Sequence, residues 1–174
     1  SDGAGTLPTD SENDRTDGLP SAARCRCSGG RCRYSRRVGS ALVIPTYQEA
    51  ENIGRLLASI RSCCPDLQVI VCDDNSPDGT GELAETAAAE LGGIEVLHRP
   101  GKAGLGAAYR HGFRHALDQG FDVVGQMDAD FSHDPSVLPR LLAAVERGAD
   151  VAVGSRYVPG GSVPHDRRLA LVGD

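Results

Sequence analysis

The stretch Gly125-Gln-Met-Asp-Ala-Asp-Phe-Ser-His-Asp-Pro135 follows a mostly apolar run, Phe121 to Val124, and places two carboxylates one residue apart. We predict a strand over Phe121–Met127. Asp128 and Asp130 then project to one side, because alternate residues of an extended chain share a face. Carboxylates without His or Cys suit Mg²⁺ or Mn²⁺, which keep water and take further ligands from substrate phosphates. An isolated pair of this kind is more often a solvated loop, so the interpretation depends on the rest of the chain.

Short apolar runs alternate with helical segments along residues 40–153. Unbroken apolar runs predict strands, and apolar spacings of three and four predict helices. We predict strands over Ala41–Ile44 (ended by Pro45), Leu67–Cys72, Ile94–Leu97, Phe121–Met127 and Val151–Val153. We predict helices over Glu49–Cys63, Thr80–Leu91, Leu105–Leu117 and Asp134–Gly148, with Thr80 and Asp134 as N-caps. This alternation is typical of an α/β fold, Rossmann-like, in which helices flank both faces of a mostly parallel sheet.

Polar residues follow each predicted strand at its carboxyl end. In chain order they are Pro45–Glu49, Asp73–Gly79, His98-Arg99, Asp128–Asp130 and Gly154–Arg156. In an open parallel sheet the ligand crevice lies beyond the carboxyl ends of the strands. The agreement of these strand ends therefore predicts one polar crevice along that edge.

Two basic residues near these strand ends have two interpretations each. Gly101-Lys-Ala-Gly-Leu-Gly106 matches neither the Walker nor the dinucleotide-binding pattern. It is either a tight turn before a helix or a turn whose Lys102 helps to bind a phosphate. Arg156 is either a surface residue in a weak ion pair or the countercharge of a phosphate in the crevice.

The composition narrows the class of protein. The chain has 174 residues, a net charge of −6 and no Trp, which argues against nucleic acid as a partner. Its six cysteines accompany a full apolar complement, so no disulfide framework is needed and we expect a reducing compartment. No apolar stretch reaches the roughly 20 residues that span a bilayer, and the N-terminus lacks a signal-peptide core. We therefore expect a soluble or peripheral protein.

The chain divides into two parts by composition. Residues 1–39 are rich in Gly, Ser, Asp and Arg and predict a disordered N-terminal extension. Residues 21–39 carry six arginines and no acid. This cluster is either a solvated tail or a contact with acidic lipid headgroups. Residues 40–174 form the predicted folded domain.

Five motifs in order resemble the family-2 glycosyltransferases of the GT-A fold. They are Val43-Ile-Pro-Thr-Tyr-Gln-Glu-Ala-Glu-Asn52, Val71-Cys-Asp-Asp-Asn-Ser-Pro-Asp-Gly-Thr80, Arg99-Pro-Gly-Lys-Ala-Gly-Leu-Gly106, Met127-Asp-Ala-Asp-Phe-Ser-His133 and Gly154-Ser-Arg-Tyr157. Within that family the chain looks most like the dolichol-phosphate (polyprenol-phosphate) mannosyltransferases, over residues 41–163.

The resemblance implies transfer of mannose from GDP-mannose to a polyprenyl phosphate of the dolichyl type, with inversion, at the cytoplasmic face of a membrane. By matching position, it implies that the nucleoside is held by Pro45, Tyr47, Glu49 and Asp74. It implies that Asp128 and Asp130 hold Mg²⁺ or Mn²⁺ on the donor diphosphate, with Ala129 lining the site and Ser132 as a ligand, direct or through water. Arg156 would meet a donor or acceptor phosphate, so Asp130 and Arg156 are the expected catalytic residues.

The sequence departs from this family after Gly160-Gly161. Residues 164–171 form a shorter segment without Trp, and with Arg167 aligned to the family's Arg they put Leu171 where relatives have a Ser. We therefore expect an incomplete C-terminal part, weak nucleotide binding and poor mannose transfer. Two alternatives stay open: a related family-2 enzyme with a UDP-sugar donor, and a non-catalytic nucleotide-sugar-binding remnant.

Overall fold

The computed structural model describes residues 39–155 and confirms the alternation of strands and helices, with one exception near its end. The strands are β1 (Ser40–Thr46), β2 (Gln68–Asp73), β3 (Ile94–His98) and β4 (Val123–Gln126). The helices are α1 (Ile53–Cys63), α2 (Thr80–Leu91), α3 (Leu105–Asp118), the short 3-10 helix η1 (Pro135–Val137) and α4 (Leu138–Glu146). Within residues 39–155, no helix is both long and apolar enough to cross a membrane. The predicted extension, apart from Gly39, and the predicted ligand Arg156 lie outside the described residues.

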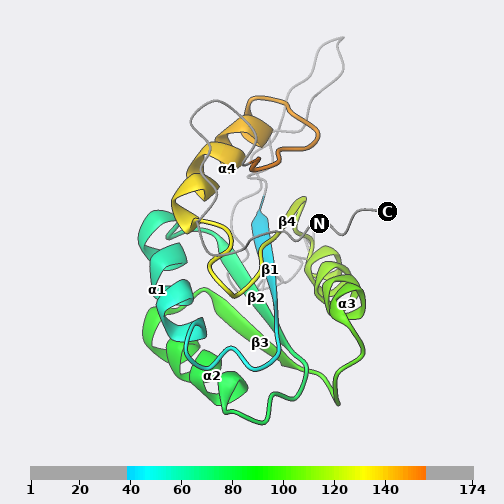
Figure 1. The fold of residues 1–174 in the computed structure, drawn as a ribbon. Helices are drawn as coiled ribbons and strands as arrows, with labels where there is room; N and C mark the ends of the chain where they lie inside the picture. The colour runs from blue at the N-terminus through cyan, green and yellow to red at the C-terminus, as the bar shows by residue number, and fades with distance from the viewer. Residues whose placement is uncertain (1–38, 156–174) are drawn as a thin grey trace, which may run out of the picture. The chain divides into compact units, whose positions relative to one another are not determined.

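The four strands form one parallel sheet in the order β3-β2-β1-β4. Figure 1 shows α1 and α2 on one face of this sheet and α3 on the opposite face. Along β1, Leu42 and Ile44 belong to the core cluster on the α1 side, whereas Ala41 and Val43 belong to the cluster on the α3 side. A strand covered on both faces needs apolar residues at successive positions. The predicted α/β class, with helices flanking a parallel sheet, is therefore confirmed.

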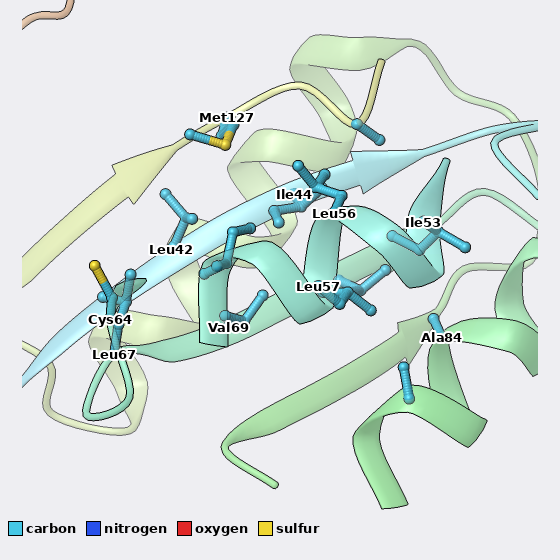
Figure 2. Close-up of a cluster of buried hydrophobic side chains, with 14 of the residues drawn as sticks. Leu42, Ile44, Ile53, Leu56, Leu57, Cys64, Leu67, Val69, Ala84 and Met127 are labelled. Carbon is cyan, nitrogen blue, oxygen red and sulfur yellow. The ribbon is translucent and has the colours of Figure 1, made fainter. Parts of the chain in front are cut away.

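The larger core cluster packs α1 against β1 and β2. Ile53, Leu56, Leu57 and Ile60 are all fully buried, and their spacing of three and four places them on one stripe of the helix. Figure 2 shows Ile53, Leu56 and Leu57 of α1 in one cluster with Leu42 and Ile44 of β1. Burying one such side chain contributes about 1.5–3 kcal/mol. This stripe fixes the position of α1 and of the loop that precedes it.

Helix α3 lies unusually close to the other face of the sheet. A Cβ atom added to Gly112 would lie 2.4 Å from Val43 Cγ1 and 2.8 Å from Cys72 Sγ. Gly112 is buried between Ala108 and Ala116, which are also buried. Three small residues at a spacing of four thus let the helix approach β1 and β2 more closely than larger side chains would.

Pro45 does not end the first strand, as the sequence predicted. It lies inside β1, where it pairs in register with Cys72 of β2. Its missing N–H group costs no ladder hydrogen bond. The carbonyl of Val43 accepts from Met127 N–H on the β4 side, and the carbonyl of Thr46 accepts from Asp74 N–H on the β2 side. Pro45, two residues after Val43, therefore directs its nitrogen toward β4, whose pairing with β1 ends at Val43.

The predicted fifth strand, Val151–Val153, is wrong for this structure. Residues 151–155 carry no strand assignment, and Val151 and Val153 are each 76% exposed. The alternation of apolar residues fits a strand, but a strand also needs a partner for its backbone groups. Within residues 39–155, β4 pairs only with β1, so no ladder extends to this segment.

The last predicted helix divides into η1 and α4. Asp134 caps it as predicted, because its Oδ1 accepts from Ser136 N–H at 2.9 Å. This hydrogen bond holds the pKa of Asp134 below its usual value. The first predicted helix begins later than expected: the carbonyl of Glu49 accepts from Asn52 and Ile53 N–H groups, and α1 starts at Ile53.

Candidate functional site

A cavity of about 250 Å³ lies at the carboxyl edge of the sheet. It is lined by the ends of β1, β2 and β4 and by the start of α3, with the following residues: Pro45, Thr46, Tyr47, Glu49, Asp74, Lys102, Gly104, Leu105, Ala108, Asp128, Ala129 and Asp130. Among the described residues, every one predicted to bind the nucleotide or the metal lines this cavity except Ser132. The polar crevice expected from the strand ends is thus present in the described part of the chain.

The side chain of Asp128 is hydrogen-bonded to a residue of α3. Tyr109 Oη of α3 donates to Asp128 Oδ1 at 2.6 Å, and within residues 39–155 Oδ2 of Asp128 has no hydrogen-bond partner. Burial, this hydrogen bond and the negative charges of Asp128 and Asp130 raise the pKa of Tyr109. The tyrosine is therefore a proton donor to the carboxylate throughout the neutral range.

Asp130 is shaped by a turn of its own loop. Its Oδ1 accepts from Ser132 N–H at 2.9 Å, across Phe131, whose φ of +56° is left-handed. Such a φ is uncommon outside glycine. The Ser132 hydroxyl lies 3.1 Å from His133 Nδ1. In this structure Ser132 thus supports Asp130 through its backbone.

The donor set of the cavity fits a hard divalent cation. Among residues 39–155, no group of three or more His, Cys, Asp and Glu side chains is placed to hold an ion by itself. Mg²⁺ and Mn²⁺ sites of nucleotide-dependent enzymes commonly use one or two carboxylates, with substrate phosphates and water as the remaining ligands. Asp128 and Asp130, on alternate residues beside the buried Ala129, match that class of site.

Asp74 connects the end of β2 to the loop between β3 and α3. Its side chain is 6% exposed, forms an ion pair with Arg99, and accepts from Ala103 N–H at 3.3 Å. The same loop carries Lys102, whose Nζ lies 3.9 Å from the centre of the Tyr47 ring. A buried carboxylate needs such partners. Asp74 therefore fixes the loop that brings Lys102 over the cavity.

The loop that carries Tyr47 and Glu49 is held by the loop after β2. Three backbone N–H groups, of Gln48, Glu49 and Ala50, donate in turn to Ser76 Oγ, Thr80 Oγ1 and Asp78 Oδ2 at 3.1, 2.9 and 3.2 Å. Thr80 is the first residue of α2 and not its N-cap, a position that Gly79 occupies. The Thr80 hydroxyl donates a hydrogen bond to Asp78 Oδ1 at 2.6 Å. This hydrogen bond is the main cause that lowers the pKa of Asp78.

Asp73 anchors both loops from inside the protein. It is 2% exposed, and its carboxylate accepts from Thr46 Oγ1 at 2.9 Å, Ser76 N–H at 3.0 Å and Ser76 Oγ at 2.6 Å. Glu49 Oε2 in turn accepts from Asn52 Nδ2 at 2.9 Å. The first carboxylate of the Asp73-Asp74 pair therefore has a structural role, and the second faces the cavity.

Tyr109 was not predicted from the sequence, and Arg99 and Asp73 were placed at the polar edge without an individual role. Arg99 and Asp73 stand at strand ends that we expected to be polar, so their position was a usable signal. Tyr109 gave no signal, because it lies in a helix whose apolar spacing predicts a core residue. The structure does not describe Arg156, so its place relative to the cavity stays a prediction.

Two solved structures share the fold. Residues 1–349 of S. aureus TarS match with a TM-score of 0.54 at 21% identity, over 63% of this chain and 32% of that chain. Glucosyl-3-phosphoglycerate synthase from Mycobacterium tuberculosis, solved in complex with Mn²⁺, UDP-glucose and phosphoglyceric acid, matches with a TM-score of 0.51 at 24% identity, over 64% and 40%. At these identities the likeness concerns the fold alone.

Curated relatives match at higher identity. The polyprenol monophosphomannose synthase of Mycolicibacterium smegmatis is 53% identical over 133 residues, covering 75% of this chain and 50% of the relative. The undecaprenyl-phosphate mannosyltransferase of Micrococcus luteus is 54% identical over 130 residues, covering 73% and 53%. The dolichol-phosphate mannosyltransferase of Pyrococcus furiosus is 39% identical over 138 residues, covering 76% and 38%. The chain thus spans about half the length of the first two relatives and 38% of the third.

The resemblance to polyprenol-phosphate mannosyltransferases is confirmed by these identities. The family model "Glycosyl transferase family 2" matches residues 41–171, which is most of the chain. The match includes β1 to β4, except for Ser40 at the start of β1, and all residues that line the cavity. The chain therefore belongs to glycosyl transferase family 2.

Proposed function

We propose that the protein transfers mannose from GDP-mannose to a polyprenyl phosphate of the dolichyl type, with inversion at the sugar carbon. The observation that carries this proposal is the cavity, which gathers Tyr47, Glu49 and Asp74 beside the carboxylates Asp128 and Asp130. The names of the relatives at 53% and 54% identity support mannose as the sugar and a polyprenyl phosphate as the acceptor. Guanosine as the nucleoside rests on the motif resemblance.

The proposed reaction needs no strong base from the protein. An oxygen of the acceptor phosphate attacks the anomeric carbon of mannose, the bond from that carbon to the donor diphosphate breaks, and GDP leaves with the electron pair. A phosphate monoester has a second pKa of about 6, so near neutral pH its attacking oxygen is already largely deprotonated. The main obstacle is the approach of two anions, so the residues of the site have to position them and offset their charge.

The charges lining the cavity suit this task when they act in two groups. Asp128 and Asp130 would hold Mg²⁺ or Mn²⁺, which supplies positive charge to the donor diphosphate when bound. Lys102, whose ammonium lies over the Tyr47 ring at the cavity, adds a cation of the protein itself. We assign Arg156 a similar role toward a donor or acceptor phosphate, since an Arg fork binds phosphate in two places. Asp130 and Arg156 are the proposed catalytic residues.

The substrates also set a location. A polyprenyl phosphate lies in a membrane and a nucleotide sugar lies in the cytosol, so we propose that the protein acts at the cytoplasmic face of a membrane. The six arginines of residues 21–39 offer a peripheral contact with anionic lipid. Such a cluster gains about 1 kcal/mol per Lys or Arg near an anionic surface. In this proposal residues 1–39 form an extension of the GT-A domain of residues 40–174.

The test is the transfer of radiolabelled mannose to polyprenyl phosphate, with and without Mn²⁺ or Mg²⁺. Calorimetric titrations with GDP-mannose and UDP-glucose under the same conditions identify the donor. We expect metal-dependent transfer and tighter binding of GDP-mannose. Asp130→Ala should abolish the metal dependence of both mannose transfer and GDP-mannose binding, because it removes one of the two carboxylates at the cavity. Asp118→Ala, an exposed acid at the end of α3, serves as the matched control.

Each contrary outcome has a distinct meaning. Full metal-dependent transfer by Asp130→Ala would contradict the assignment of the carboxylates. Tighter binding of UDP-glucose, with transfer of its sugar, would favour the related family-2 enzyme. Metal-dependent binding of GDP-mannose without transfer, even after a family-like C-terminal segment is added, would favour a nucleotide-sugar-binding protein.

A further inference from the structure

Tyr109 touches the proposed metal site from outside the cavity. Its hydroxyl lies 2.6 Å from Asp128 Oδ1, yet Tyr109 is absent from the residues that line the cavity, although its neighbour Ala108 is among them. The tyrosine therefore contacts the carboxylate from the side of α3 and not from the cavity. None of the five motifs that indicated the site contains it.

We propose that Tyr109 is a positioning residue, which fixes the orientation of the Asp128 carboxylate. In this orientation Oδ1 stays hydrogen-bonded to Tyr109 and Oδ2 faces the cavity. The inference rests on the proposed function, because it assumes that Asp128 binds the metal. The terminal torsion of an Asp side chain is broad and roughly two-fold, so without a partner the carboxylate rotates. A short hydrogen bond to an ionised acceptor is among the strong ones and removes that freedom.

The position of the Tyr109 hydroxyl is set by packing and not by a flexible loop. The Tyr109 ring packs on Phe113, with ring centres 5.8 Å apart, in the core cluster on the α3 side. One turn later, Gly112 brings the helix within contact of Val43 and Cys72. Because β1 is also the hydrogen-bonded neighbour of β4, the same strand locates both the helix that carries Tyr109 and the strand that leads to Asp128.

The consequence for the metal is geometric. If Oδ1 stays with Tyr109, Asp128 serves as a ligand through one oxygen, and the direction of that oxygen is fixed before the ion arrives. Partners that orient a metal ligand in this way typically change metal affinity by about 10–100-fold when they are removed. A tyrosine that only fills the core would instead change stability and leave metal affinity as it was.

The variant Tyr109→Phe removes the hydroxyl and keeps the ring. We expect its dissociation constant for Mn²⁺, measured by calorimetry on the full chain with GDP present, to rise about 10-fold. In mannose transfer, the Mn²⁺ concentration for half-maximal rate should rise by a similar factor, whereas kcat at saturating Mn²⁺ should change less. Phe121→Leu is the control: it removes another ring of the same core cluster, one that is not paired with Tyr109, so it should lower stability and leave Mn²⁺ affinity unchanged.

A double-mutant cycle with Asp128→Asn locates the effect. We expect Tyr109→Phe to cost little further Mn²⁺ affinity in the Asp128→Asn background, because the oxygen that it orients is already changed. Wild-type Mn²⁺ affinity in Tyr109→Phe, or an equal loss in both backgrounds, would overturn the role of Tyr109 alone. Failure of the unmodified chain to bind Mn²⁺ with GDP would overturn the metal site itself, and the role of Tyr109 with it.

Discussion

The variant Gly112→Ala tests the close approach of α3 to the sheet. The new Cβ would lie 2.4 Å from Val43 Cγ1 and 2.8 Å from Cys72 Sγ. Carbon atoms in contact prefer about 3.5–4.0 Å, so the gap must open by roughly 1 Å or more. Val43 cannot yield, because it is fully buried in β1 between β2 and β4. The helix therefore has to move outward and lose contacts along its buried side.

Two opposing terms set the expected magnitude. Overpacking a core costs about 1–3 kcal/mol. Replacing Gly by Ala inside a helix returns about 1 kcal/mol through backbone entropy. Because the contact is so short and the strand so constrained, we take the upper end of the cost and expect Gly112→Ala to lose about 2 kcal/mol in the free energy of unfolding. The outward movement should also loosen the contact of Tyr109 with Asp128.

Urea denaturation at neutral pH measures this change, with Gly106→Ala as the matched control. Gly106 lies in the same helix, and its added Cβ would meet only Arg110 Nη1, at 3.5 Å. The same chemical change should there be neutral or stabilising by up to about 1 kcal/mol. If Gly112→Ala were as stable as the wild type, the close packing of α3 on β1 and β2 would be refuted.

Three further predictions follow from the loops and the core. Asp73→Ala should lower the free energy of unfolding by about 3 kcal/mol in urea, since three hydrogen bonds lose their acceptor, whereas the exposed Asp66→Ala should change little. Thr80→Val should destabilise the protein at neutral pH, and its deficit should shrink as the pH falls below about 4. The reason is that the Thr80 hydroxyl lowers the folded-state pKa of Asp78; that stabilisation is complete above the unfolded pKa and disappears as the pH falls through the folded pKa. A deficit that stayed constant from neutral pH into acid would contradict this linkage. Burial raises the pKa of Cys72 to about 11, so the native thiol should resist iodoacetamide near neutral pH, and rapid labelling detected by mass spectrometry would show that the core is open.

Sequence predicted most of the sheet because its strands are buried on both faces. The run Leu67–Cys72 differs from β2 by one residue at each end, and Ile94–Leu97 is one residue shorter than β3. The agreement is close because an unbroken apolar run bounded by polar residues is typical of a buried strand. The site followed from the same logic, because parallel strands bring their carboxyl ends to one edge. Asp128 and Asp130 therefore lie in one cavity with Asp74, although they are more than fifty residues away from it.

What the sequence missed depends on partners far along the chain. Val151–Val153 has a strand-like pattern, but a strand exists only where another strand accepts its backbone hydrogen bonds. We expected Pro45 to end β1 because proline has no N–H group for a ladder hydrogen bond. Which neighbouring strand its nitrogen faces depends on the whole sheet, so the sequence did not show that Pro45 could stay inside β1. Tyr109 was missed for a related reason: a helical pattern identifies a buried face, but not which buried hydroxyl meets a carboxylate.

The three N–H groups of residues 48–50 that are bound by side chains of the next loop have a thermodynamic consequence for nucleotide binding. Ordering one residue of a mobile loop costs about 1–2 kcal/mol of backbone entropy. Here that cost is met during folding, before any nucleotide arrives. The proposed binding of nucleotide at Tyr47 and Glu49 should therefore show only a small entropic penalty in calorimetry, and its association rate should be limited by encounter and charge and not by a loop rearrangement.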